Sequence, residues 1–201
     1  MPKRSRYRLF SLGTVLLLLS APQAIAQPKE LPLGSPLPMQ DLAVQLVDGS
    51  QTTIGALVGN AGTVMLFWSN NCQWTDGYTD RVTALQRQYT PQGIRFVLIN
   101  ANDPNEFPQE AASVGAEKQH PMPYVMDVGA KFAESVGAFR TPHVFVFDGD
   151  KTLVYTGGID DSPADPNNVQ HTYLKDVVDA LAQGTAVEPL ATKAFGCRIK
   201  F

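Results

Sequence analysis

The chain has 201 residues, of which 44% are hydrophobic, with 16 basic and 19 acidic side chains. Its length suits a single globular domain. The acidic excess argues against binding to nucleic acid or to anionic membrane surfaces. The only two cysteines and three scattered histidines lack metal-site spacing, and no glycine-rich phosphate cradle occurs, so neither a metal nor another cofactor is expected.

The first 26 residues have the pattern of a secretory signal. A basic start precedes an apolar stretch from Leu9 to Leu19, and small residues then flank the expected cleavage position at Ala24 and Ala26. The stretch is short for a membrane span, although an uncleaved anchor is the alternative. We predict cleavage after Ala26 and export to the periplasm or the extracellular space, with no membrane segment left in the mature chain.

The next elements follow in chain order. Residues 27–40, rich in proline and leucine, predict an extended lead-in. Alternating apolar residues before Asp48-Gly49 predict a β-hairpin whose return strand covers 51–54. The nearly continuous apolar run at 62–68 predicts a strand covered on both faces. Apolar residues spaced by four, three and four between 72 and 89 predict an amphipathic helix.

The second half alternates in the same way. The predicted elements are a strand at 94–99, an irregular helix to about 118, a strand at 124–126, a helix at 131–136, a hairpin of 144–147 with 152–156, and a helix at 169–183. This order predicts an α/β fold with a mixed central β-sheet and helices on both faces. It is the order of a thioredoxin-like three-layer sandwich with an N-terminal hairpin added. We expect this domain to span 41–184 and a tail, 185–201, to carry Cys197.

Cys72 lies where the predicted strand 62–68 leads into the predicted helix. The first backbone N–H groups of a helix have no partner within the helix and stabilise an anion, and the pKa of a cysteine falls at helix N-termini. Cys72 is therefore a candidate nucleophile. The alternative is an inert, buried cysteine.

The residues around Cys72 resemble the active-site segment of exported thioredoxin-like oxidoreductases. Those proteins have Phe-Trp, three residues, and then Cys-x-x-Cys. Here Phe67-Trp68 and Cys72 match, but Thr75 stands at the second cysteine position. A local resolving cysteine is therefore absent. Trp68, Asn70 and Trp74 are the candidate pocket residues, although simple packing would also explain the two tryptophans.

Three motifs together resemble redoxin-domain proteins of the alkyl hydroperoxide reductase and thiol-specific antioxidant superfamily. Those proteins have Asn-His-Cys-Pro at the active cysteine, Cys-Thr-Pro before a late strand, and a Gly-Cys-Ser-Ile-Lys-Trp end. This chain has Asn70-Asn71-Cys72-Gln73, Arg140-Thr141-Pro142, and a terminal Gly196-Cys197-Arg198-Ile199-Lys200-Phe201. The resemblance covers most of residues 31–201.

The resemblance implies a cis bond between Thr141 and Pro142, with this proline facing Cys72. It leaves open the role of Arg140, which replaces a cysteine. An inward guanidinium would stabilise a thiolate, whereas an outward one would be a solvated surface group. Cys197 also has three interpretations: a resolving or bridging partner of Cys72, a bridge to another molecule, or a free thiol.

Two functions follow as hypotheses. The first is an exported thiol-dependent oxidoreductase, in which Cys72 attacks a disulfide of a protein partner or a small peroxide. The second is a non-catalytic thioredoxin-like binding module in which Cys72 and Cys197 form a structural disulfide.

Overall fold

A computed structural model describes residues 29–187 and 190–201 of the chain. The predicted signal segment, residues 1–26, lies outside the described residues. Within the described part, no helix has the length and apolar character needed to cross a membrane.

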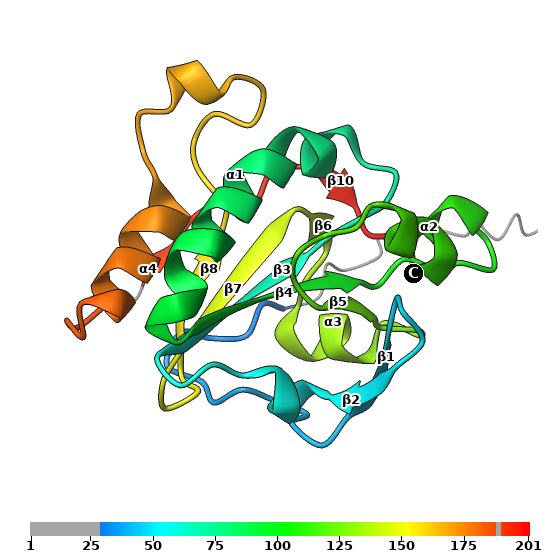
Figure 1. Cartoon of the computed structure of the whole chain (residues 1–201), viewed down its shortest axis with the longest axis horizontal. Coiled ribbons are helices and arrows are strands. Elements are labelled where there is room, and N and C mark those ends of the chain that lie inside the picture. The colour runs from blue at the N-terminus through cyan, green and yellow to red at the C-terminus, as the bar shows by residue number, and fades with distance from the viewer. Residues whose placement is uncertain (1–28, 188–189) are drawn as a thin grey trace, which may run out of the picture.

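An eight-stranded mixed sheet forms the centre of the fold (Figure 1), with the strand order β2-β1-β5-β4-β3-β7-β8-β9. Strand β3 pairs in parallel with β4 and antiparallel with β7, so it lies in the middle of the sheet. The strands are β1 (Ala43–Leu46), β2 (Gln51–Thr53), β3 (Gly62–Phe67), β4 (Ile94–Asn100), β5 (Tyr124–Met126), β7 (His143–Asp148), β8 (Leu153–Gly157) and β9 (Leu190–Ala191).

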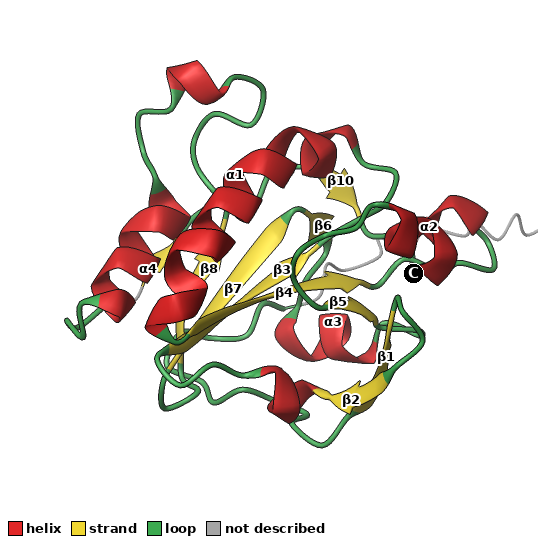
Figure 2. Cartoon of the chain, in the orientation of Figure 1, coloured by secondary structure: helices red, strands yellow, loops and turns green. Residues whose placement is uncertain are grey.

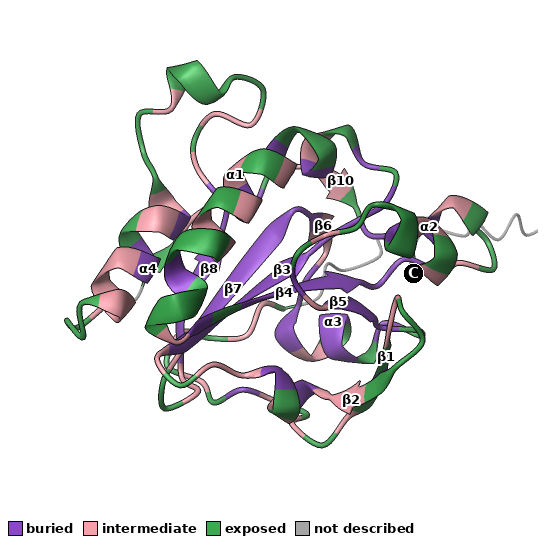
Figure 3. Ribbon diagram, viewed as in Figure 1, coloured by how far each residue is buried: buried purple, intermediate pink, exposed green. Residues whose placement is uncertain are grey.

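Each face of the sheet is covered, as Figures 2 and 3 show. Because side chains alternate along a strand, Val64 and Leu66 of β3 join the core under α1 and α4, whereas Met65 and Phe67 join the core with α3. The helices are α1 (Gln73–Tyr89), α2 (Ala112–Glu117), α3 (Lys131–Val136) and α4 (Tyr173–Ala182). The predicted thioredoxin-like sandwich is confirmed.

Two predicted element boundaries are wrong, for local reasons. The return strand of the hairpin ends at Thr53 because its hydroxyl accepts a hydrogen bond from Ala56 N at 3.3 Å and begins a short 3₁₀-helix. The last helix begins at Tyr173 rather than at 169. The carboxylate of Asp165 caps another 3₁₀-turn, Pro166–Asn168, before the chain turns into α4.

The tail, 185–201, contains strands that the sequence pattern does not predict. After β9, which pairs with β8, strand β10 (Cys197–Arg198) pairs antiparallel with β6 (Arg140–Thr141) in a separate two-stranded sheet. Ile199 follows β10 and is buried in the core on the α3 side. Strand pairing and two buried apolar side chains, Ala194 and Ile199, therefore attach the tail to the domain.

Candidate functional site

Cys72 is the N-cap residue of α1, at the carboxyl end of the central strand β3. Its carbonyl oxygen accepts hydrogen bonds from Thr75 N and Asp76 N, at 3.0 and 3.1 Å. No side chain caps the helix, so the first N–H groups of α1 remain available to an anion at this position. The residue itself is only 1% exposed.

A disulfide joins Cys72 to Cys197, across a sequence separation of 125 and a Cα–Cα distance of 6.2 Å. Of the three interpretations of Cys197, the structure therefore shows pairing with Cys72. Cys197 is partly exposed, whereas Cys72 is buried. The two cysteines thus differ in how much of each residue is exposed to solvent.

The tail is held against the strand that precedes Pro142. Cys197 is the register partner of Thr141, and Ile199 N donates to the carbonyl of Phe139 at 3.0 Å. The backbones approach so closely at Gly196, where φ is +155°, that a Cβ atom would lie 2.1 Å from Thr141 O. Glycine is therefore required where the tail reaches the site.

A Gly196→Ala variant is expected to weaken the attachment of the tail and thereby the disulfide. We expect the reduction potential of the Cys72–Cys197 pair to rise by about 30 mV or more, since a loss of about 1.4 kcal/mol corresponds to that value. Equilibration in thiol buffers measures the shift. Gly184→Ala is the matched control, because Gly184 also has a positive φ but open space around it. An equal potential for both variants would contradict the expectation.

The residues around Pro142 also meet the tail. The Thr141–Pro142 peptide bond is cis, and the carbonyl oxygen of Thr141 lies 3.3 Å from Sγ of Cys72. The guanidinium of Arg140 donates from Nη1 to the carbonyl of Gly196 at 2.8 Å. In this oxidised form, Arg140 therefore holds the residue next to Cys197.

His143 follows Pro142 and is buried among aromatic rings. Burial, with a smaller contribution from the Arg140 charge, lowers the pKa of His143 to about 3. Nε2 lies 3.1 Å from the hydroxyl of Thr156, whereas the carboxylate of Glu30 is 3.8 Å away and partly exposed. The hydroxyl contact and the burial outweigh the distant carboxylate, so we describe His143 as neutral.

The neutral state of His143 predicts acid sensitivity. Unfolded histidine has a pKa near 6.5, so the unfolded chain binds a proton that the folded chain excludes. The contribution of His143 to the free energy of unfolding should be complete above pH 6.5. It should fall by about 1.4 kcal/mol per pH unit below that value, until about pH 3. A His143→Gln variant should flatten this slope in urea unfolding at pH 7, 5.5 and 4.5. Exposed His171→Gln is the control, and an unchanged slope in His143→Gln would contradict the prediction.

A buried carboxylate holds the loop that precedes Cys72. Glu110, 1% exposed, accepts hydrogen bonds from Ser69 Oγ at 2.6 Å and Asn70 N at 2.8 Å. It also accepts one from Asn100 Nδ2 at 3.0 Å. Through Asn102, whose side chain accepts from Lys200 N at 2.9 Å, this network extends to the tail. The role of Glu110 is not predictable from the sequence, since none of the neighbouring residues marks it as buried.

Replacing Glu110 should destabilise the protein strongly. Glu110→Ala leaves three buried donors without their acceptor, each costing about 1–3 kcal/mol, so we expect a loss of at least about 3 kcal/mol in the free energy of unfolding. Denaturant titration measures this loss. Glu117→Ala on the exposed face of α2 is the control. A loss below about 1 kcal/mol for Glu110→Ala would show that water replaces the carboxylate.

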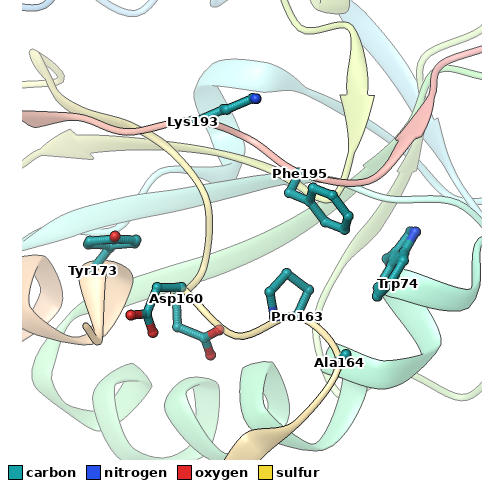
Figure 4. Close-up of a pocket in the computed structure, with 8 residues that line it drawn as sticks. Trp74, Asp160, Pro163, Ala164, Tyr173, Lys193 and Phe195 are labelled. Atoms are coloured by element: carbon teal, nitrogen blue, oxygen red, sulfur yellow. The ribbon is translucent and has the colours of Figure 1, made fainter. Parts of the chain in front are cut away.

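A cavity of about 450 Å³ lies between the start of α1 and the tail (Figure 4). Its walls include Trp74, two residues after Cys72, and Phe195, two residues before Cys197; their ring centroids are 4.9 Å apart. The loop after β8 and the start of α4 complete it. The lining residues are Trp74, Asp160, Asp161, Pro163, Ala164, Tyr173, Lys193 and Phe195.

Of the three candidate pocket residues, the structure places only Trp74 in this cavity. Trp68 is 2% exposed and lies edge-on to His120 within the core on the α1 side. Asn70 is buried, where it donates to the carbonyl of Ala111 and accepts from the hydroxyl of Tyr124. The cavity residues of the tail and of the loop after β8 come from distant parts of the sequence, which is why the sequence pattern does not reveal them.

Comparison with protein families gives a match of residues 32–172 to the model described as Redoxin. The chain belongs to the redoxin family. The resemblance that the sequence motifs indicate is thus confirmed. No curated protein matches this redoxin.

Solved structures resemble the redoxin over most of its length. An uncharacterized conserved protein from Geobacillus kaustophilus is 31% identical, with a TM-score of 0.77, over 85% of this chain and 92% of the other. A hypothetical protein from Sinorhizobium meliloti is 28% identical, also with a TM-score of 0.77, over 86% and 96%. Peroxiredoxin Q from Xanthomonas campestris is 16% identical, with a TM-score of 0.54, over 77% and 97%, a likeness that shows a shared fold.

Proposed function

We propose that this redoxin is a thiol-dependent oxidoreductase in which Cys72 is the nucleophile and Cys197 the resolving thiol. The single observation that carries the proposal is the disulfide between a cysteine at the uncapped start of α1 and a cysteine on a docked tail. When this bond opens, the sulfur of Cys72 is left where helix N–H groups favour the thiolate.

The reaction that we propose is thiol–disulfide exchange with a partner. The Cys72 thiolate attacks one sulfur of the partner's disulfide, and the other partner sulfur leaves as a thiolate. Cys197 then attacks the mixed disulfide at Cys72, which releases the partner's second thiol and restores the Cys72–Cys197 bond. Because Thr75 replaces a local second cysteine, the tail supplies the resolving group.

Peroxide as the substrate has less support. A peroxide site benefits from a cation beside the reactive sulfur, because the cation stabilises the thiolate and the developing charge. Here the guanidinium of Arg140, the candidate for this role, donates to the tail carbonyl of Gly196. We therefore propose disulfide exchange as the main reaction, and the experiment below also measures the reaction with peroxide.

The reduction potential of the Cys72–Cys197 pair tests the proposal. A redox-active pair should equilibrate in thiol buffers between about −180 and −270 mV, whereas structural disulfides lie below about −300 mV. The burial of Cys72 is the observation that favours a structural disulfide, so a potential below −300 mV would replace our proposal with the non-catalytic module. Intact mass after stoichiometric hydrogen peroxide, for the reduced parent and for Cys197→Ser, shows whether Cys72 also forms a sulfenic acid.

Ionisation of the reduced Cys72 thiol gives a separate prediction. Its position at the start of α1 should give an apparent pKa below the value of about 8.5 for free cysteine. The rate of iodoacetamide alkylation against pH, in the Cys197→Ser variant, measures this pKa. Cys72→Ser reports the tail thiol for comparison. A Cys72 value above 8.5 would argue against a reactive nucleophile.

Export belongs to the proposal as well. The basic start and the apolar stretch of residues 1–26 support export. The disulfide also fits export, because disulfides persist in the oxidising compartments outside the cytosol. Expression of the full chain in a bacterium, followed by fractionation and mass spectrometry of the N-terminus, tests export and the cleavage site after Ala26 together.

A further inference from the structure

The cavity between the start of α1 and the tail is lined by aromatic and charged side chains that neither strand packing nor thiol–disulfide exchange requires. Its apolar walls, formed by Trp74, Phe195, Pro163 and Tyr173, enclose about 450 Å³, which lies within the range of small-molecule sites. Figure 4 shows these rings around the opening, with Lys193 at one side and Asp160 at the other.

Two charged side chains of this cavity, Asp161 and Lys193, have no ion-pair partner among the described residues. Asp160 is neutralised, because it accepts from Arg81 Nη1 at 2.6 Å and from the Tyr78 hydroxyl at 2.7 Å. Within the described part of the chain, the Asp161 carboxylate accepts hydrogen bonds only from the backbone, including Gln170 N at 2.9 Å. Backbone hydrogen bonds from His171 and Gln170 lower the pKa of Asp161, which keeps it charged.

In the oxidised form, the disulfide holds the segment that supplies one wall of the cavity. Lys193 and Phe195 lie on the segment between Thr192, which is hydrogen-bonded to Thr156 of β8, and Cys197, which is held by the disulfide. If reduction releases the whole end of the tail, including β10 and the buried Ile199, this wall keeps only the contacts of Thr192 and Ala194. In that case, a ligand that requires this wall binds the oxidised protein, whose reactant is a reducing thiol.

We propose that this cavity binds the body of a small zwitterionic peptide thiol that reduces the Cys72–Cys197 disulfide. A ligand ammonium would pair with Asp161 and a ligand carboxylate with Lys193, while its chain packs on Trp74 and Phe195. This inference rests on the proposed function, because it supplies the reductant of the same disulfide.

The reducing step involves two thiols. The first thiolate attacks Sγ of Cys197, the partly exposed cysteine. A new S–S bond forms, the bond between the two cysteines breaks, and Cys72 leaves as the thiolate. A second thiol then attacks the sulfur of the bound small thiol. The products are a small-molecule disulfide and the free Cys197 thiol, so two thiols are oxidised as one protein disulfide is reduced.

Reduction kinetics test the proposal with glutathione and the uncharged 2-mercaptoethanol as probes. Reduction is followed by tryptophan fluorescence, to which Trp68 and Trp74 both contribute, and by mass after thiol labelling. The Asp161→Asn/Lys193→Gln double variant should slow reduction by glutathione about fivefold to tenfold, as expected for two exposed ion pairs, and leave reduction by 2-mercaptoethanol unchanged within about twofold. The control pair, Asp150→Asn/Lys131→Gln, carries the same charge changes at exposed positions outside this cavity.

A ligand that binds the cavity but cannot react distinguishes the cavity proposal from the proposed oxidoreductase function. S-methylglutathione, which has no thiol, should bind the oxidised parent and bind at least about fivefold more weakly to the double variant and to the Cys197→Ser variant. Equal reduction rates for parent and double variant with glutathione, or equal binding, would overturn the cavity proposal and leave the oxidoreductase standing. A disulfide that resists both thiols would overturn the oxidoreductase and, with it, the reducing step.

Discussion

Reduction of the Cys72–Cys197 disulfide should lower the free energy of unfolding by about 5 kcal/mol. The bond closes a loop with a sequence separation of 125, and a closure of that length removes about 5 kcal/mol of chain entropy from the unfolded state in the loop-closure description. Guanidinium unfolding of the oxidised and the phosphine-reduced protein measures the difference.

The control for this prediction is the Cys72→Ser/Cys197→Ser double variant, whose stability should not respond to the phosphine. In the parent, a loss of less than about 1 kcal/mol would mean that the unfolded chain is not constrained by the bond. Such a small loss would also mean that, apart from its strand pairing, the tail contributes little to the free energy of unfolding.

Cys72→Ser should abolish exchange with disulfide partners, whereas Cys197→Ser should stop the reaction half-way. Removing a nucleophile eliminates the covalent step, so we expect turnover to fall by at least about 10³-fold in Cys72→Ser. In Cys197→Ser, Cys72 still attacks, but no tail thiol releases the partner. A mixed disulfide should therefore accumulate, and intact mass spectrometry detects it as one partner molecule bound at Cys72.

The two variants separate the roles of the cysteines. Both lose the disulfide, and therefore its contribution to stability, so the loss of stability alone cannot produce different products. A mixed disulfide that is trapped at Cys197 in Cys72→Ser, with none at Cys72 in Cys197→Ser, would assign the nucleophile to the tail and contradict our mechanism.

In this site, the cysteine at the helix N-terminus and the cysteine partly exposed to solvent are two different residues. Cys72 has the helix N-terminus but is buried, and Cys197 is partly exposed but lies on a short edge strand. A reductant that reaches Cys197 expels the better leaving group, because a thiolate at the start of α1 is stabilised. The same tail that covers Cys72 therefore provides the route by which the disulfide can be opened.

Much of the fold follows from local sequence patterns. The continuous apolar run of β3 requires two covered faces, and the periodicity of α1 requires one buried side, so Cys72 is placed at their junction by the sequence alone. The signals are strong because each depends on residues within a few positions of one another. Where a local competitor exists, as at Thr53 or Asp165, the element boundary moves and the sequence pattern misplaces it.

Only the tertiary structure decides how distant segments meet. The pairing of Cys72 with Cys197, the position of Arg140 on Gly196, the burial of Glu110 and the cavity wall at Lys193 all join residues from separate elements. A sequence pattern records which side chains are apolar and how they repeat, but it does not record which polar group faces which across the chain. That information arises when folding brings the end of β3, strand β6 and the tail to one place, where the two cysteines meet.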